Sequence, residues 1–231
     1  MQQTKKLPIS LIIPVLNDAV FLKSLLDQVC RIDLFEEIIV VDGGSADESR
    51  DVAKSFAVLL VQSKTGRAIQ MNEAARIGTG VYFLFLHADV KISPDFPATI
   101  KSLVADKITL ANFCLEFDKK NPILDFSAYL TRFSTNIFQF GDQGLWLKAD
   151  LFKEVGGFDE NCLLLEDQEI LTRLRKKHQL KKQKECLVVS ARKYEKHGVL
   201  RLQMIYSWIY LRYRFGMSQE DLAKLYQSLL N

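Results

Sequence analysis

The chain has 231 residues, of which 48% are hydrophobic and 26% charged, and its mean hydropathy is +0.01. This apolar content is enough for one large core and excludes a disordered, a fibrous or a small disulfide-stabilised protein. No apolar run approaches the roughly 20 residues of a membrane-spanning helix. The run that begins at Leu7 is broken by prolines and lacks a small-residue cleavage site, so we expect the first strand of a cytoplasmic protein, not a signal peptide.

Charge is unevenly distributed along the chain. The formal net charge is +3, yet residues 175–214 contain 12 Lys and Arg against two acidic residues. A basic segment of this kind is typical of proteins that meet nucleic acid or a membrane surface. We expect an anionic membrane surface and no nucleic acid, with a solvated basic face as the alternative.

The four cysteines are isolated from one another in the sequence. They form no C-x-x-C pair, so neither a zinc site nor a disulfide framework is indicated. We therefore expect buried, reduced thiols at Cys30, Cys114, Cys162 and Cys186.

Short apolar runs alternate with helical patterns through the first half of the chain. Repeated strand–helix units predict a mainly parallel sheet flanked by helices, an α/β fold. Ser45 and Glu48 have the spacing of a capping box for the second helix, and Pro94 is expected at the first position of the fourth. The expected strands are 9–16, 37–41, 58–61 and 81–86, and the expected helices are 19–30, one opening at 45, 67–77 and one opening at 93.

The pattern loosens after residue 107. No linker or internal repeat interrupts it, so we expect one domain over residues 1–231 with a helical extension at 198–231. The expected strands are 108–117 and 187–189, with a loop and strand over 141–146, and the expected helices are 123–137, 149–156, 167–177, 198–214 and 218–229.

Polar residues follow three of the expected strands. Asn17 and Asp18 follow the first, Asp42 the second, and His87 and Asp89 the fourth. In an open parallel sheet, ligands bind at the carboxyl ends of the strands, so we expect these side chains to converge. Carboxylates there can accept hydrogen bonds from a nucleoside or hold a divalent metal.

Arg67 opens the third expected helix, directly after Gly66. A guanidinium beside a helix N-terminus suits a diphosphate, although an ordinary surface arginine is the alternative. The chain has neither the G-x-G-x-x-G of a dinucleotide-binding loop nor a P-loop motif, which argues against a dehydrogenase and a P-loop NTPase.

Four motifs in order resemble those of family 2 glycosyltransferases of the GT-A fold. They are 13–18 (Ile-Pro-Val-Leu-Asn-Asp), 40–47 (Val-Val-Asp-Gly-Gly-Ser-Ala-Asp), 86–90 (Leu-His-Ala-Asp-Val) and 165–168 (Leu-Glu-Asp-Gln). The chain is also similar to a small bacterial subgroup associated with radical-SAM and selenodomain proteins. Segments 66–72, 141–143 and 190–194 carry that likeness, which extends over about residues 8–229.

The resemblance implies roles for individual residues. Asp167 would be the catalytic base, with Glu166 in support, and Asp89 would hold Mg²⁺ or Mn²⁺, with His197 as a second candidate ligand. The halves 8–107 and 108–197 would bind the nucleotide and carry the acceptor and catalytic residues, respectively. The nucleotide-sugar residues would be Pro14, Asn17, Asp18, Asp42, Arg67, His87 and Asp89, and the acceptor residues Asp142, Gln143 and Trp146.

Alternatives remain for several of these residues. Trp146 could instead belong to the core, and His197 could be an exposed histidine. His87 stands where the family's Asp-x-Asp motif has its first acid, which puts the strength of metal binding in doubt. The Gln-x-x-Arg-Trp motif of processive synthases is missing, which argues against processive synthesis.

The resulting expectation is an inverting, metal-dependent glycosyltransferase. It would move a sugar from a nucleotide-diphosphate sugar to a hydroxyl acceptor. A sugar-nucleotide nucleotidylyltransferase and a catalytically inactive nucleotide-sugar-binding protein are the alternatives.

Two apolar stripes run along the expected helix at 199–215. Docking on the protein's own core needs one of them, so the second is surplus. A core contact, a dimer contact or the cytoplasmic membrane surface could cover it, and the last would imply a peripheral enzyme with a lipid or lipid-linked acceptor. The surplus stripe consists of Leu200, Met204, Trp208, Leu211 and Phe215.

Overall fold

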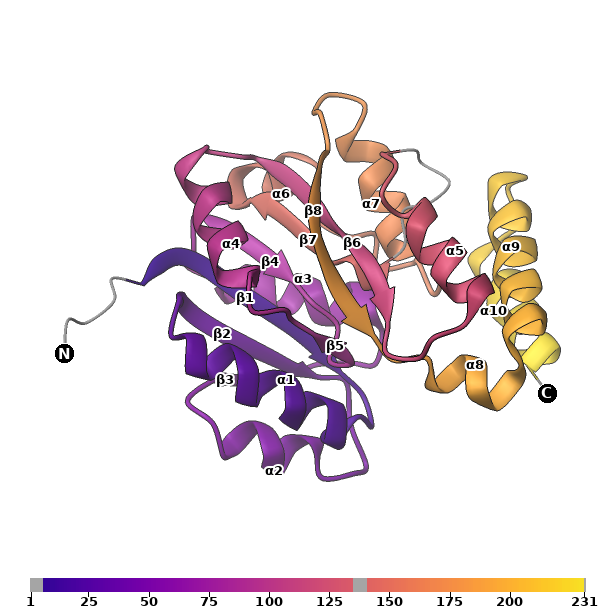
Figure 1. Cartoon of the computed structure of the whole chain (residues 1–231), viewed down its shortest axis with the longest axis horizontal. Helices are drawn as coiled ribbons and strands as arrows, with labels where there is room; N and C mark the ends of the chain where they lie inside the picture. Colours follow the sequence, from indigo (N-terminus) through magenta and orange to yellow (C-terminus); the bar gives the residue numbers. More distant parts are fainter. Residues whose placement is uncertain (1–5, 135–140, 231) are drawn as a thin grey trace.

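The computed structural model describes residues 6–134 and 141–230 (Figure 1). Strands and helices alternate through its first half, in the order β1 (Leu7–Val15), α1 (Ala19–Ile32), β2 (Phe35–Asp42), α2 (Ser49–Lys54), β3 (Leu59–Gln62), α3 (Arg67–Ile77), β4 (Tyr82–Phe85), β5 (Val90–Lys91) and α4 (Phe96–Ala105). The second half contains β6 (Leu110–Phe117), α5 (Pro122–Leu130), the 3₁₀ turn η2 (Gly141–Gln143), β7 (Leu145–Lys148), α6 (Ala149–Glu154), α7 (Glu166–Leu174), β8 (Lys181–Val189), α8 (Arg192–His197), α9 (Val199–Arg214) and α10 (Gln219–Leu230).

The strands form one sheet in the order β3-β2-β1-β4-β7-β6-β8-β5. The first four are parallel to one another, as the strand–helix pattern predicts. Strand β7 is antiparallel to β4 and to β6 and joins the first four strands to the parallel pair β6 and β8. Strand β5 lies at the edge of the sheet, antiparallel to β8. The sheet is therefore mixed, and the carboxyl ends of β1, β2 and β4 lie at the same edge.

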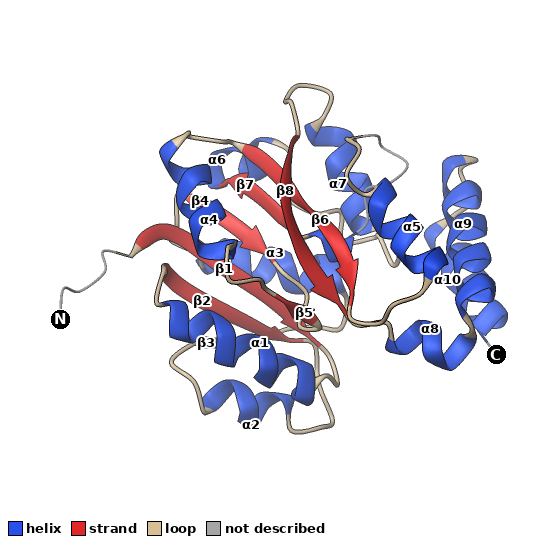
Figure 2. Ribbon diagram, in the orientation of Figure 1, coloured by secondary structure: helices blue, strands red, loops and turns tan. Residues whose placement is uncertain are grey.

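Helices cover both faces of the sheet (Figure 2). Side chains alternate between the two faces along β1: Leu11 and Ile13 pack with α1 and α4, whereas Ile12 packs with α3, α6 and α7. The two C-terminal helices, α9 and α10, form a separate apolar cluster around Ile205, Ile209 and Leu222. They lie beside α5 at one end of the molecule (Figure 1).

Several predicted boundaries are wrong for local reasons. Ser45 does not cap α2, because its N–H donates to Asp42 and the helix begins at Ser49, whose N–H is accepted by Asp47. Helix α4 begins at Phe96, after Pro94. Helix α5 ends at Leu130, and the last residues of the predicted 123–137 helix lie outside the described part of the chain.

The prediction of four reduced thiols is also wrong. Cys114 on β6 and Cys186 on β8 are register partners and form a disulfide, whereas Cys30 and Cys162 are free. The two bonded cysteines are 72 residues apart, so no local spacing signals the pair.

Candidate active site

Hydrogen bonds tie the ends of β1 and β2 together. Asn17 has a left-handed backbone, with φ of 53°. Its N–H donates to Ser45 Oγ at 2.9 Å, and its Oδ1 accepts from the Ala46 N–H at 2.7 Å. Asp42 is buried and accepts from the Ser45 N–H at 3.0 Å. The predicted nucleoside residues thus belong to one rigid edge, next to the buried Pro14.

Arg67 and the Glu-Asp pair meet across the site. Arg67 is the first residue of α3, and its Nε lies 2.9 Å from Oε1 of the buried Glu166 at the start of α7. Arg67 is half exposed, and the partial loss of its hydration alone would lower its pKa, but the carboxylates of Glu166 and Asp167 raise it. The guanidinium therefore compensates a cluster of buried negative charge.

Asp167 is buried beside Glu166. Burial, followed by repulsion from Glu166, raises the pKa of Asp167 to about 7. A carboxyl group with this pKa exchanges a proton near neutrality, as a general base must. Leu165, the residue before the pair, has a left-handed backbone with φ of 62°, a conformation that costs a branched side chain energy.

His87 pairs with Asp142. His87 Nδ1 lies 3.2 Å from Asp142 Oδ1, which brings the end of β4 to η2. Burial opposes both charges, yet the hydrogen bond between them raises the pKa of His87 and lowers the pKa of Asp142 to about 2. The contact therefore favours the protonated form of His87 and the carboxylate form of Asp142.

Asp89 and Asp18 share the guanidinium of Arg192, a residue that is not among the predicted site residues. Arg192 on α8 donates to both oxygens of Asp18 at 2.6 Å, and its Nη2 lies 3.8 Å from Asp89 Oδ2. Burial and the neighbouring Asp142 raise the pKa of Asp89. Arg192 belongs to segment 190–194, one of the segments that carry the likeness to the bacterial subgroup, so that segment could have indicated this residue.

These residues fit a divalent cation in one mode. Among the described residues, no group of three or more His, Cys, Asp or Glu side chains could hold a metal by itself. Mg²⁺ and Mn²⁺ are often held instead by one or two carboxylates together with substrate phosphates. Asp89 suits that mode, because its charged form is disfavoured by burial and by Asp142 and would be favoured by a nearby cation.

His197 lies in a different environment from the predicted metal site. It lines a cavity of about 420 Å³ together with Asn17, Arg192, Lys193 and Lys196. Cations, rather than acids, surround it there, so the structure offers no support for His197 as a metal ligand.

Two of the predicted acceptor residues are buried. Trp146 is fully buried on β7, stacks on Tyr82 and donates its Nε1–H to the Ile108 carbonyl at 2.8 Å. Gln143 is buried as well, and its Oε1 accepts from Lys182 Nζ. Trp146 therefore belongs to the core, the alternative to an acceptor role, and Gln143 anchors η2 to the interior. Of the three predicted acceptor residues, Asp142 lies at the site, paired with His87.

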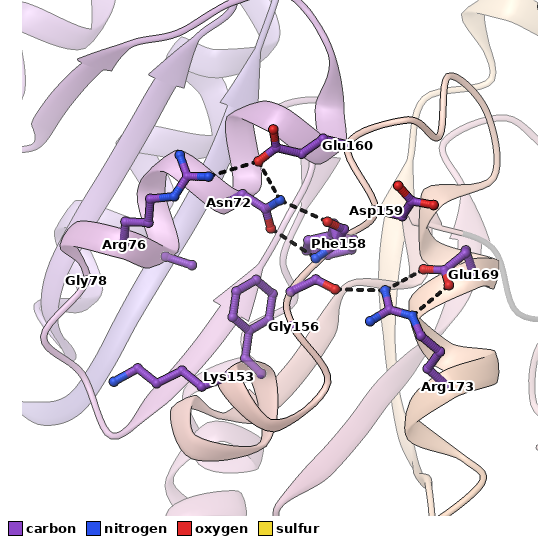
Figure 3. A pocket seen from close by; sticks show the side chains of 13 residues that line it. Asn72, Arg76, Gly78, Lys153, Gly156, Phe158, Asp159, Glu160, Glu169 and Arg173 are labelled. Carbon is purple, nitrogen blue, oxygen red and sulfur yellow. Dashed lines mark hydrogen bonds and ion pairs between the residues drawn. The ribbon is translucent and has the colours of Figure 1, made fainter. Parts of the chain in front are cut away.

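A more open cavity of about 880 Å³ lies between α3, α6 and the loop before α7 (Figure 3). Four of its charged side chains, Arg76, Glu160, Glu169 and Arg173, form ion pairs with one another. Arg76 contacts Glu160 at 3.0 Å, Asn72 donates to Glu160 at 2.9 Å, and Arg173 pairs with Glu169. These contacts hold α3 and α7 in place, and we assign no ligand to this cavity.

Comparison with known proteins identifies the family. The family described as "Glycosyl transferase family 2" matches residues 10–151. A "PGL/p-HBAD biosynthesis glycosyltransferase" of Mycobacterium tuberculosis is 39% identical over 88 residues, which cover 35% of this chain and 34% of that protein. The match thus spans about a third of the length of this curated relative.

Solved structures show the same architecture. The mannosyltransferase PcManGT from Pyrobaculum calidifontis, in complex with GDP-Man and Mn²⁺, superposes with a TM-score of 0.68 at 19% identity and covers 97% of this chain and 69% of its own. Residues 1–349 of TarS from S. aureus give a TM-score of 0.66 at 15% identity, covering 96% and 70%. The GT-A fold predicted from the motifs is confirmed.

Proposed function

Because the chain belongs to glycosyl transferase family 2, we propose that it transfers a sugar from a nucleotide-diphosphate sugar to a hydroxyl acceptor, with inversion at the anomeric carbon. The observation that best supports this proposal is Asp167, a buried carboxyl group whose pKa is raised to about 7 at the edge of the sheet where ligands bind.

The donor would lie along the ends of β1, β2 and β4. Pro14, Asn17, Asp18 and Asp42 would contact the nucleoside, and Arg67 would face the diphosphate. TarS was crystallised with UDP-GlcNAc and PcManGT with GDP-Man, which supports a nucleotide-sugar donor here and leaves its base open.

A divalent ion would be held by Asp89, together with the donor phosphates. Such an ion, Mg²⁺ or Mn²⁺, would stabilise the negative charge that develops on the departing diphosphate. Groups of this chain that can supply positive charge near the same position include Arg67, Arg192, Lys193 and His87, whose pKa is raised.

Asp167 would accept the proton of the acceptor hydroxyl. As that proton moves to the carboxylate, the oxygen forms a bond to the anomeric carbon and the bond from that carbon to the diphosphate oxygen breaks. Attack opposite to the leaving group inverts the configuration. Glu166 would position Arg67 rather than take the proton, because adjacent residues on a helix point about 100° apart.

We further propose that the acceptor is a lipid or a lipid-linked hydroxyl and that transfer takes place at the cytoplasmic face of a membrane. The basic segment 175–214 supports attachment to an anionic surface.

A thermal-shift panel with UDP, GDP, CDP and dTDP, each with and without Mn²⁺, tests donor binding. We expect one nucleotide to raise the Tm, and to raise it more with Mn²⁺. Donor hydrolysis is then measured with the matching nucleotide sugar, using Asp167→Asn as the control that binds without turning over. The absence of a shift with all four nucleotides would contradict the proposal.

A further inference from the structure

Helix α9 carries a stripe of apolar side chains that the described part of the chain leaves exposed. Its buried side is formed by Leu202, Ile205 and Ile209, and the two isoleucines pack with α10 and with the loop before α7. About 130° around the helix, at ~100° per residue, lies the second stripe. Its five side chains are between 44% and 80% exposed, and we call them the α9 stripe: Leu200, Met204, Trp208, Leu211 and Phe215.

Arginines border the α9 stripe on both edges. Arg201 and Arg212 lie along one edge and Arg214 along the other, and the helix contains no Asp or Glu. The Arg212 guanidinium lies 5.6 Å from the centre of the Trp208 ring. An apolar stripe of this width between cationic edges, with a tryptophan at its centre, is typical of a helix that lies in the plane of a membrane interface.

Helix α5 presents further apolar side chains beside α9. The two helices are in contact (Figure 1), and Phe126 and Tyr129 of α5 are both more than half exposed. Ile123 and Phe133 are also exposed. In a monomeric protein, exposed apolar side chains gathered in this way mark an interaction surface.

From these observations we infer that the α9 stripe, together with the exposed side chains of α5, docks on an anionic lipid bilayer. The inference rests on the proposed function and deepens it, because it names the surface through which a lipid acceptor would be approached. None of the helices that the structure describes could span a bilayer. Apolar side chains would enter the interface while the arginines contact lipid phosphates.

A second copy of the chain suits this surface less well. A symmetric dimer brings the same patch of both subunits together, so the arginine-bordered stripes would face each other. Helix α9 has no acidic side chain to compensate these charges. An anionic bilayer supplies the missing negative charge.

The surface is connected to the proposed active site through α8. Arg192, which contacts Asp18 and lies near Asp89, is the first residue of α8, and only Gly198 separates that helix from α9. Lys193 and Lys196 line the cavity between these elements. Docking through α9 would therefore bring the edge of the active site close to lipid headgroups.

The two tryptophans allow a direct test with the whole protein. Trp146 is buried and Trp208 is half exposed, so a change in emission on adding vesicles reports on α9. We expect phosphatidylcholine vesicles containing phosphatidylglycerol to shift the emission to shorter wavelength, and pure phosphatidylcholine vesicles to leave it unchanged. The shift should weaken with added salt and be lost in Trp208→Phe. An unchanged spectrum with both vesicles at low salt would overturn the inference.

Vesicle co-sedimentation with a matched pair of variants tests the surface itself. The triple variant Leu200→Ser, Met204→Ser and Phe215→Ser should bind anionic vesicles at least about tenfold more weakly. The control triple variant Leu59→Ser, Ile77→Ser and Val81→Ser, exposed elsewhere, should bind as the wild type does. Equal vesicle binding by the wild type and the α9 variant would overturn the inference. It would also be overturned if sedimentation velocity showed that the wild type and the control variant form a dimer and the α9 variant does not.

Nucleotide binding separates this inference from the proposed function. The α9 variant should respond to UDP, GDP, CDP and dTDP with Mn²⁺ as the wild type does. If the protein binds a nucleotide but not vesicles, the inference about the α9 surface fails and the proposed function stands. If it binds vesicles but responds to no nucleotide, the proposed function is contradicted.

Discussion

Arg192 and Asp18 are 174 residues apart in the sequence and form a two-bond ion pair with both N···O distances at 2.6 Å. The pair attaches α8 to the end of β1, and Arg192 also stacks over Phe21, 4.2 Å from its ring centre. The C-terminal part of the chain thereby contributes a cation to the edge of the sheet formed by the N-terminal strands.

Arg192→Lys should not replace this contact. A lysine ammonium cannot make the two parallel hydrogen bonds or stack as a guanidinium does. Both side chains are partly exposed, so we expect a loss of only about 1 kcal/mol of stability. Thermal unfolding of Arg192→Lys, Asp18→Asn and the double variant measures it. Additive effects of the two substitutions would show that the pair contributes no coupling energy.

Asp167→Asn should preserve nucleotide binding and lower transfer by about 100-fold or more, because the base is lost. Wild-type turnover should rise with pH through about 7, as Asp167 loses its proton. Single-turnover rates across pH 5.5–8.5, together with nucleotide affinity, check both expectations. Near-normal turnover of the variant would move the base elsewhere, with Glu166 and Asp142 as the next candidates.

The same substitution should increase stability at high pH. The folded-state pKa of Asp167 is raised to about 7, above the unfolded value of about 3.9. Because the folded state binds this proton more tightly than the unfolded state, Asp167 contributes its full stability below about pH 3.9. This contribution to the free energy of unfolding is lost as the pH rises to about 7. The Tm of Asp167→Asn should exceed that of the wild type increasingly from pH 4 to pH 7. An equal difference at both pH values would contradict the raised pKa.

Arg67→Met should destabilise the protein because it leaves Glu166 buried without its cation. Arg67 is half exposed, so we expect about 1–3 kcal/mol rather than the larger cost of a fully buried pair. Adding Glu166→Gln should recover part of that loss. Urea unfolding of the two single variants and the double variant gives the coupling energy, and a double variant less stable than Arg67→Met would contradict the pairing.

Asp89→Ala should abolish the effect of Mn²⁺ on nucleotide binding. The other position of the motif is His87, so no second carboxylate there can take over from Asp89. Binding of the nucleoside diphosphate without metal should change much less. Isothermal titration with and without Mn²⁺ measures both affinities. If the affinity with Mn²⁺ stays within about twofold of wild type, Asp89 does not hold the ion.

Reduction of Cys114–Cys186 should lower the Tm. The bond closes a long loop, for which the expected stabilisation is about 2–4 kcal/mol. Calorimetry with and without reductant measures the loss, and Cys114→Ala with Cys186→Ala is the variant that should not respond to reductant. Thiol titration of the denatured protein should find two thiols before reduction and four after; four before reduction would contradict the disulfide.

Local signals predict the regular elements well. Helix α3 has the predicted bounds, because Gly66 and Gly78 flank a segment that packs on β1 and β2. Strand β8 begins six residues earlier than expected, since its polar start at Lys181 has no apolar pattern and is ordered by pairing with β6.

The sequence predicts which strand ends and motifs contribute residues to the site, but not how those residues pair. His87, Asp89, Asp142 and Asp167 could be chosen from their motifs. The pairing of His87 with Asp142 and of Asp89 with Arg192 depends on tertiary contacts between distant segments, which the motifs do not reveal. The burial of Trp146 could not be predicted for a similar reason. A tryptophan on a strand gives no sign of which face is covered, and here its ring belongs to the core that α1 and α4 form with the sheet.

Leu165 connects the C-terminal helices to the residue that would act as base. It packs with Leu164 against the cluster of α9 and α10, and Gln219 of α10 accepts the N–H groups of Leu163 and Leu164 at 3.0 Å. Deleting the chain after Gly198 would thus do more than remove a docking surface. It would remove the apolar contacts and the backbone hydrogen bonds that hold the turn before α7. The shortened enzyme would then lose the position of the first residues of α7, which include Asp167.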